Sequence, residues 1–125
     1  MEHYDITNKG KLEMEQQAYF TQEVDNGNSG PAIVIDWTLG NKQKVTLTGA
    51  PNCVVSFTAP SGCTTLTLKI VQGAGGGKTA TWPGTVKWAT PPGAPALSVA
   101  AGAIDIAGFY FDGASYFGIE SSNFV

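Results

Sequence analysis

The sequence predicts an all-β domain, an antiparallel β-sandwich of the jelly-roll type that follows an extended N-terminal arm. From residue 31 onward, short runs alternate between apolar and polar side chains, which is the pattern of strands with one buried face. Clusters of Gly, Pro, Asn and Ser separate these runs and predict turns. The 16 glycines and 7 prolines among 125 residues also argue against long helices.

Residues 1–30 are expected to form the arm, and residues 31–125 the sandwich. Residues 9–20 alternate poorly, and residues 26–31 have the composition of a loop. The apolar side chains of the arm are few, namely Tyr4, Ile6, Leu12, Met14, Tyr19 and Phe20. Ordering each residue costs about 1–2 kcal/mol of backbone entropy. We therefore expect an arm that is disordered on its own and ordered by a neighbouring subunit.

Within the sandwich, turns separate the expected strands. The clearest strand is at residues 64–71, where Leu66, Leu68 and Ile70 face one way and polar residues face the other. The Asp-Gly pair at 112–113 predicts a tight hairpin between the last two strands. The expected strands are residues 32–38, 45–48, 53–58, 64–71, 79–82, 86–88, 104–111 and 115–119.

The two cysteines are predicted to be reduced and far apart. A hairpin turn at residues 59–63 would place Cys53 opposite Lys69 rather than opposite Cys63. Five residues at about 3.3 Å each would then separate the two thiols by roughly 16 Å. A disulfide needs Cα atoms within about 7 Å of each other, so none is expected.

Charge argues against several classes of partner. All seven basic residues are lysines and the net charge is −3, so the arginine forks and basic surface that bind phosphates are missing. No run of 18 apolar residues is present that could span a membrane. The acidic start, Met-Glu-His-Tyr-Asp, does not resemble a signal peptide. We expect synthesis in a cytosol, and neither a nucleic acid nor a membrane as partner.

No catalytic, cofactor or metal site is expected. The Gly-rich run before Lys78 looks like a phosphate-binding loop, but position 72 is Gln where that loop needs Gly. A β-like run then follows instead of the required helix, so we interpret the run as a flexible hairpin tip. The single histidine, His3, lies in the arm and leaves neither a Ser-His-Asp set nor zinc ligands at the usual spacing.

Carboxylates and tryptophans give two further hypotheses for sites. The carboxylates considered for a glycosidase pair are Asp36, Asp105, Asp112 and Glu120. We expect Asp112 to bond to the backbone of its own turn, and Asp36 and Asp105 to face outward from strands. Trp37, Trp82 and Trp88 could form a platform for a sugar, although burial in the core explains large aromatic rings as well.

The strand at residues 104–111 is apolar on both faces. Residues 104, 106, 108 and 110 share one face, and Ala107, Phe109 and Phe111 share the other. Such a strand is either central within a sandwich or covered by a second chain. The low charge, 14% of residues against about 25% in typical soluble domains, favours a covering subunit. The residues predicted at a subunit interface are Tyr19, Phe20, Phe109, Phe111 and Phe117.

Short motifs follow one another in a distinctive order through residues 32–119. They are Val-Thr-Leu-Thr-Gly (45–49), a later Pro-Ser-Gly turn, Thr-Ala-Thr-Trp-Pro (79–83), Val-Lys-Trp (86–88), Ala-Pro-Ala-Leu-Ser (94–98), Gly-Ala-Ile-Asp-Ile (102–106) and Phe-Tyr-Phe-Asp-Gly-Ala-Ser-Tyr-Phe-Gly (109–118). In this order they resemble a β-sandwich domain that recurs in virion proteins of tailed bacteriophages.

The resemblance implies a non-catalytic homotrimer that is either a capsid cement (decoration) protein or the tip of a tail fibre or spike. The chain begins with Met and has about 30 residues, and no fibre shaft, before the expected sandwich. We therefore expect a small decoration protein on the capsid surface of a virion, which stabilises the head by binding between major capsid protein subunits. The alternative is a tail-fibre or spike tip that binds a host-surface glycan receptor.

Overall fold

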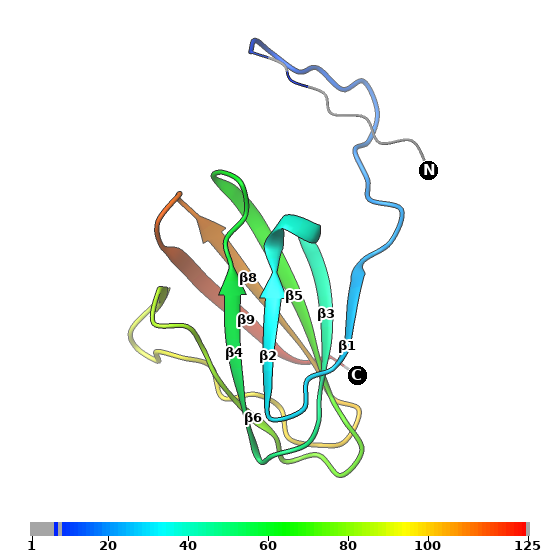
Figure 1. Cartoon of the computed structure of the whole chain (residues 1–125), viewed down its shortest axis with the longest axis vertical. Helices are drawn as coiled ribbons and strands as arrows, with labels where there is room; N and C mark the ends of the chain where they lie inside the picture. The colour runs from blue at the N-terminus through cyan, green and yellow to red at the C-terminus, as the bar shows by residue number, and fades with distance from the viewer. Residues whose placement is uncertain (1–6, 8, 125) are drawn as a thin grey trace.

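The computed structural model describes residues 7 and 9–124 as an all-β domain, as the sequence predicts (Figure 1). Two sheets lie face to face, and a short 3-10 turn, η1, follows the second strand. The elements are β1 (Val24–Asn28), β2 (Ala32–Asp36), η1 (Trp37–Leu39), β3 (Lys42–Leu47), β4 (Asn52–Thr58), β5 (Thr64–Gln72), β6 (Thr79–Thr81), β7 (Val86–Trp88), β8 (Ile104–Phe111) and β9 (Tyr116–Phe124). The arrangement is compatible with a β-sandwich.

The two sheets differ in size. The larger sheet has six strands in the order β1-β3-β5-β8-β9-β7, and the smaller has three in the order β2-β4-β6. From β1 to β7 the chain therefore changes sheet at each step and winds as a flattened coil. The hairpin of β8 and β9 then returns to the larger sheet, so that β9 lies between β8 and β7.

The prediction of antiparallel pairing was wrong for most of the domain. Of the seven strand pairs among the described residues, five are parallel, and the two antiparallel pairs are β5–β8 and β8–β9. Parallel neighbours need a long crossover connection. Here the strand in the opposite sheet supplies that crossover. Alternating side chains reveal which face of a strand is buried but not the direction of its neighbour, so the sequence pattern did not exclude this winding.

The first strand lies inside the predicted arm. β1 pairs with β3, and the Asn26 side-chain amide donates to Gln43 Oε1 and to the Lys44 carbonyl, each at 3.0 Å. The sheet thus begins at Val24, earlier than the predicted boundary at residue 31. Residues 9–23 form no helix or strand, are exposed, and lead away from the sandwich in Figure 1. Residues 1–6 and 8 of the predicted arm, and residue 125, lie outside the described residues.

The core between the sheets is centred on an aromatic cluster. Phe109 of β8 is 1% exposed, and its ring centroid lies 5.3 Å from that of Phe57 and 5.6 Å from that of Trp88. Trp37, Trp82 and Tyr116 are within 6.0–6.4 Å of the same ring. These rings come from both sheets and from the segments joining them, so Phe109 connects the two layers.

Both cysteines are free, as predicted, although the predicted hairpin is absent. β4 and β5 belong to different sheets, and Cys53 lies beside Ala80 of β6 instead of Lys69. Cys53 is buried at the start of β4, whereas Cys63 is exposed in the connection that follows β4. The length of β4 therefore separates the two thiols, in agreement with the conclusion but not with the reason given for it.

Candidate functional site

The Gly-rich run at residues 73–77 is not a hairpin tip, because β5 and β6 lie in different sheets. The Gln72 side-chain amide donates to the Lys78 carbonyl at 2.6 Å, and the Gly77 N–H donates to the Val99 carbonyl at 2.7 Å. The run is thus a crossover held against the segment near Val99. It leads into strand β6, so the run does not open a helix whose N-terminus could hold a phosphate.

Asp105 is buried, contrary to the predicted outward position. It is 2% exposed, and its two carboxylate oxygens accept hydrogen bonds from the N–H groups of Ser98 and Asn123 at 2.7 and 2.8 Å. Asp36 instead caps η1, where its Oδ1 accepts from the Thr38 N–H and hydroxyl. Each carboxylate therefore has a structural role of its own.

Asp112 bonds to the backbone of its own turn, as predicted. Its Oδ1 accepts from the N–H groups of Ser115 and Ala114 at 2.7 and 2.9 Å. These hydrogen bonds, the one from Ser115 first, hold the pKa of Asp112 below its usual value. In the part of the chain that the structure describes, no three His, Cys, Asp or Glu side chains gather where they could hold a metal ion.

The tryptophans pack with the core rather than side by side on the surface. Trp37 is fully buried, and Trp82 and Trp88 are half-buried with their rings 5.5 Å apart and inclined by 66°. Trp88 lies over Gly118, where an added Cβ would stand 2.5 Å from the indole ring. This close approach needs glycine at 118. The three rings do not form the flat platform that the sequence hypothesis required.

Phe109 and Phe111 face the opposite way from the predicted interface. They are 1% and 4% exposed and lie in the core of the subunit, so they are not available to a second subunit. The partition of β8 into two faces is confirmed, but the outward face is the other one, with Ile106, Gly108 and Tyr110. Phe117 of β9 is exposed beside Tyr110, with ring centroids 6.4 Å apart.

The outer face of the β8–β9 hairpin is the candidate functional site, and we call it the hairpin face. It comprises Ile106, Gly108, Tyr110, Phe117 and Ile119. Ile119 is 73% exposed and lies directly across from Gly108. Because Gly108 has no side chain, it leaves a depression of about 180 Å³ that Ile106, Ile119 and Thr67 help to line. The hairpin face is therefore apolar and has a notch able to receive a side chain.

A second pocket of about 530 Å³ adjoins the hairpin face. Trp88 of β7, residues 92–96 of the following loop and residues 118–120 of β9 line it. Ile119 and Glu120 border both this pocket and the notch at Gly108. The two hollows thus form one uneven surface, and Glu120 supplies its carboxylate.

Lysines border the hairpin face on both sides. Along one row of the sheet, Lys87 of β7 pairs in register with Phe117. Along the next row, Lys42 of β3 lies two strands away from Gly108. Lys69 of β5, beside Ile106, forms an ion pair with Glu23 at 2.8 Å. This charged border resembles the polar rim around the apolar centre of a protein–protein interface.

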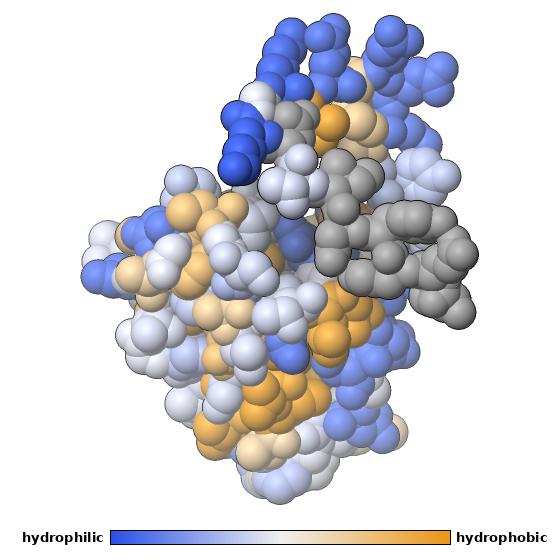
Figure 2. Space-filling model, turned by 45° about the horizontal axis from the view of Figure 1, so that its top comes forward, coloured by the Kyte–Doolittle hydropathy of each residue, from blue (hydrophilic) through white to orange (hydrophobic). Residues whose placement is uncertain are grey.

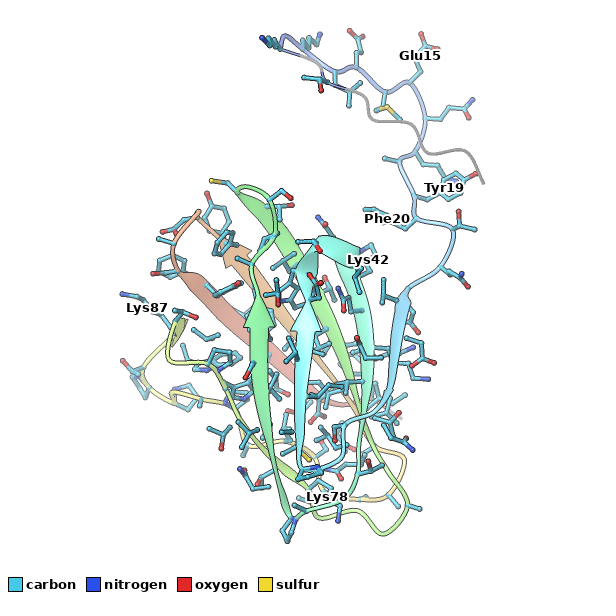
Figure 3. All side chains as sticks on the ribbon, viewed as in Figure 1. Glu15, Tyr19, Phe20, Lys42, Lys78 and Lys87 are labelled. Carbon is cyan, nitrogen blue, oxygen red and sulfur yellow. The ribbon has the colours of Figure 1, made fainter. Side chains whose placement is uncertain are left out.

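The structure does not bring the five predicted interface residues together. Tyr19 and Phe20 are exposed, but Figure 3 shows them on the segment before β1, on the other side of the sandwich from Lys87. The sequence reasoning missed Tyr110 and Ile119 as interface residues. The signal was present, because Tyr110 belongs to the alternate face of β8, but both faces are apolar and the sequence alone did not show which one points outward.

The opposite side of the sandwich carries weaker apolar surface. Figure 2 views the molecule from the side of β2 and β4 and shows hydrophobic surface over these strands. Val34 of β2 and Val54 of β4 are the large apolar side chains exposed there. Their neighbours are small polar residues, whereas the hairpin face has two aromatic rings.

Comparison with known protein families, with curated proteins and with solved structures finds no match to this chain. Among the described residues, no helix has the length and apolar character needed to cross a membrane.

Proposed function

We propose that this protein is a non-catalytic structural protein of a bacteriophage virion, a homotrimeric capsid cement protein that binds between major capsid protein subunits. The observation that carries the proposal is the hairpin face, with its apolar centre, its notch at Gly108 and its border of lysines. It offers a surface for self-association. The order of motifs in residues 32–119 supports the assignment to a virion.

Energetics favour burial of the hairpin face. Covering Tyr110, Phe117 and Ile119 stabilises an assembly by about 1.5–3 kcal/mol for each large side chain that becomes fully buried. A contiguous apolar patch of this kind commonly marks an interaction site in a soluble protein. The low proportion of charged residues, 14%, agrees with a subunit that has part of its surface covered.

The exposed segment before β1 supplies a second attachment. Leu12, Met14, Tyr19 and Phe20 are exposed there, and they contribute nothing to the core of their own subunit. Burial against neighbours in a particle would stabilise the same side chains. A cement protein with two such surfaces connects several neighbours, which is how it would strengthen a capsid.

Light scattering at low micromolar concentration is expected to show a closed trimer of about 39 kDa. Phe117→Lys combined with Ile119→Lys places two charges on the hairpin face and is expected to yield a folded monomer of 13.0 kDa. Val54→Lys on the opposite face is the matched control and keeps the trimer. A wild-type protein that remains a monomer contradicts the proposal, and immuno-electron microscopy of particles tests the capsid location separately.

The pocket beside Trp88 favours a second candidate function, a fibre or spike tip that binds a host glycan. An indole ring with a nearby carboxylate, here Glu120, suits a sugar, which stacks its apolar face and donates its hydroxyls. Trp88 fluorescence that saturates with a host glycan, and a count of a few dozen copies or fewer in each virion, would support this alternative over the cement protein.

A further inference from the structure

The winding of the chain gives each sheet a regular sequence spacing between neighbouring strands. In the first turns of the coil, Val24 of β1 lies beside Gln43 of β3, and Ala32 of β2 lies beside Val54 of β4. The partners are thus 19 and 22 residues apart. A strand that continued this coil toward the N-terminus would pair with β2 and would lie about the same number of residues before it.

β2 has a free edge at this place. Within the described residues it pairs only with β4, and that pairing is continuous from Ala32 to Asp36. Natural sheets commonly protect an edge with a proline, a lysine or a bulge, and β2 has none of these. The Pro31 carbonyl accepts from the Val54 N–H, so by alternation the backbone groups of Val34 point away from β4 toward the free edge.

Residues 11–14 have the sequence pattern of the missing strand. Leu12 and Met14 are apolar, while Lys11 and Glu13 are charged. A spacing of 21 residues, between the two observed values, places Leu12 and Met14 beside Ile33 and Ile35, whose side chains face the core. A spacing different by one residue would turn Leu12 and Met14 toward water instead. The strand ends at Met14, because residue 15 is Glu and would lie beside Asp36.

The subunit does not use this strand on its own sheet. Leu12 is 71% exposed, and Figure 1 shows the segment before β1 leading away from the sandwich. We propose that residues 11–14 of one copy add a parallel strand to the free edge of β2 in a second copy. The proposal rests on the self-association in the proposed function and names the segment, the register and the acceptor edge. Backbone hydrogen bonds would supply affinity, and Leu12 and Met14 would supply the register.

Disulfide trapping between two different chains tests the exchange. Both chains carry Cys63→Ser, which removes the exposed thiol, while Cys53 stays buried. One chain carries Glu13→Cys and the other Val34→Cys, an outward pair whose Cα atoms would be about 4.8 Å apart, within the range of a disulfide. On mild oxidation of the mixture we expect a disulfide between the two chains. Val54→Cys, outward on the next strand and about 9.6 Å away, is the matched control and does not cross-link.

A proline at the acceptor edge provides an independent test. Val34→Pro removes the N–H that faces the free edge, and an edge strand tolerates proline at such a position. Circular dichroism should show an intact fold for this variant. Cross-linking of Glu13→Cys to a cysteine at position 32, next to Val34 on the same strand, should be lost when Val34→Pro is present.

The outcomes separate this inference from the proposed function. A single chain with Glu13→Cys and Val34→Cys that closes on itself at high dilution places the strand on its own subunit and overturns the exchange. Equal cross-linking to positions 34 and 54 overturns the register. A trimer in light scattering without any cross-link refutes the strand exchange and leaves the proposed function standing, whereas a monomer refutes the proposed function as well.

Discussion

Phe109→Ala is expected to lower the free energy of unfolding by about 3–5 kcal/mol, a large part of the stability of a small domain. Phe109 contacts five other aromatic rings, including Phe57 and Trp88, and is 1% exposed. Removing its ring loses the transfer free energy of the side chain. It also leaves a cavity between the two sheets that large rigid rings fill poorly.

Urea unfolding followed by circular dichroism measures this effect, with Phe117→Ala as the matched control. Phe117 sits eight residues further along the hairpin, but its ring is 44% exposed on the outer face. Its replacement should change the stability of the monomer by under about 1 kcal/mol while weakening self-association. The opposite result, dissociation without loss of stability in Phe109→Ala, would restore the sequence prediction that Phe109 lies between subunits.

The strands were largely predictable because their signal is local. The alternation at residues 64–71 corresponds to β5, where Leu66, Leu68 and Ile70 are buried as expected. The Asp-Gly turn at 112–113 joins β8 and β9 as expected. A period of two follows from strand geometry alone, so it survives whatever partner the strand finds.

The pairing of the strands was not predictable from the same signal. The turn at residues 59–63 looks like a hairpin loop, yet it carries the chain from one sheet to the other. Short connections are shared by hairpins and by turns between packed sheets, and they differ in geometry more than in composition. β1 escaped detection for a related reason, because its sequence, Val-Asp-Asn-Gly-Asn, has the composition of a turn and pairs along a single edge.

The candidate site was half predictable. Sequence alternation divided β8 correctly into two faces, and Phe117 was correctly expected to be accessible on β9. The choice between the faces depends on tertiary packing. A Phe-rich face and a face with Ile and Tyr are both apolar enough to fill a core, and the larger rings filled it here.

Asp105 shows the limit of pattern reading most clearly, because a carboxylate in a strand is ordinarily expected to face water. Its position in β8 shares the inward face with Ala107 and Phe109. Burial of an ionised carboxylate is unfavourable unless hydrogen bonds replace its water. Here the N–H groups of Ser98 and Asn123 do so, and both belong to segments far from Asp105 along the chain.

Asp105→Ala is therefore expected to lower the free energy of unfolding by about 2–4 kcal/mol, since hydrogen bonds to a charged group are worth about 1.5–3 kcal/mol each. The loss includes the N–H groups left without an acceptor. Asp105 also stands where the register of β8 and β9 shifts, between Ile104 and Ile106. Its loss should free the end of β9 first, which hydrogen exchange detects as faster exchange at residues 120–124.

Asp36→Ala is the matched control for that experiment. Asp36 also accepts a backbone N–H, from Thr38, but it does so at the surface as the cap of η1. Loss of a cap typically removes about 1 kcal/mol. The contrast isolates burial, because both variants remove one negative charge from a chain with a net charge of −3. An Asp105→Ala protein no less stable than Asp36→Ala, with unchanged exchange at residues 120–124, would show that the buried carboxylate does not hold the end of the hairpin.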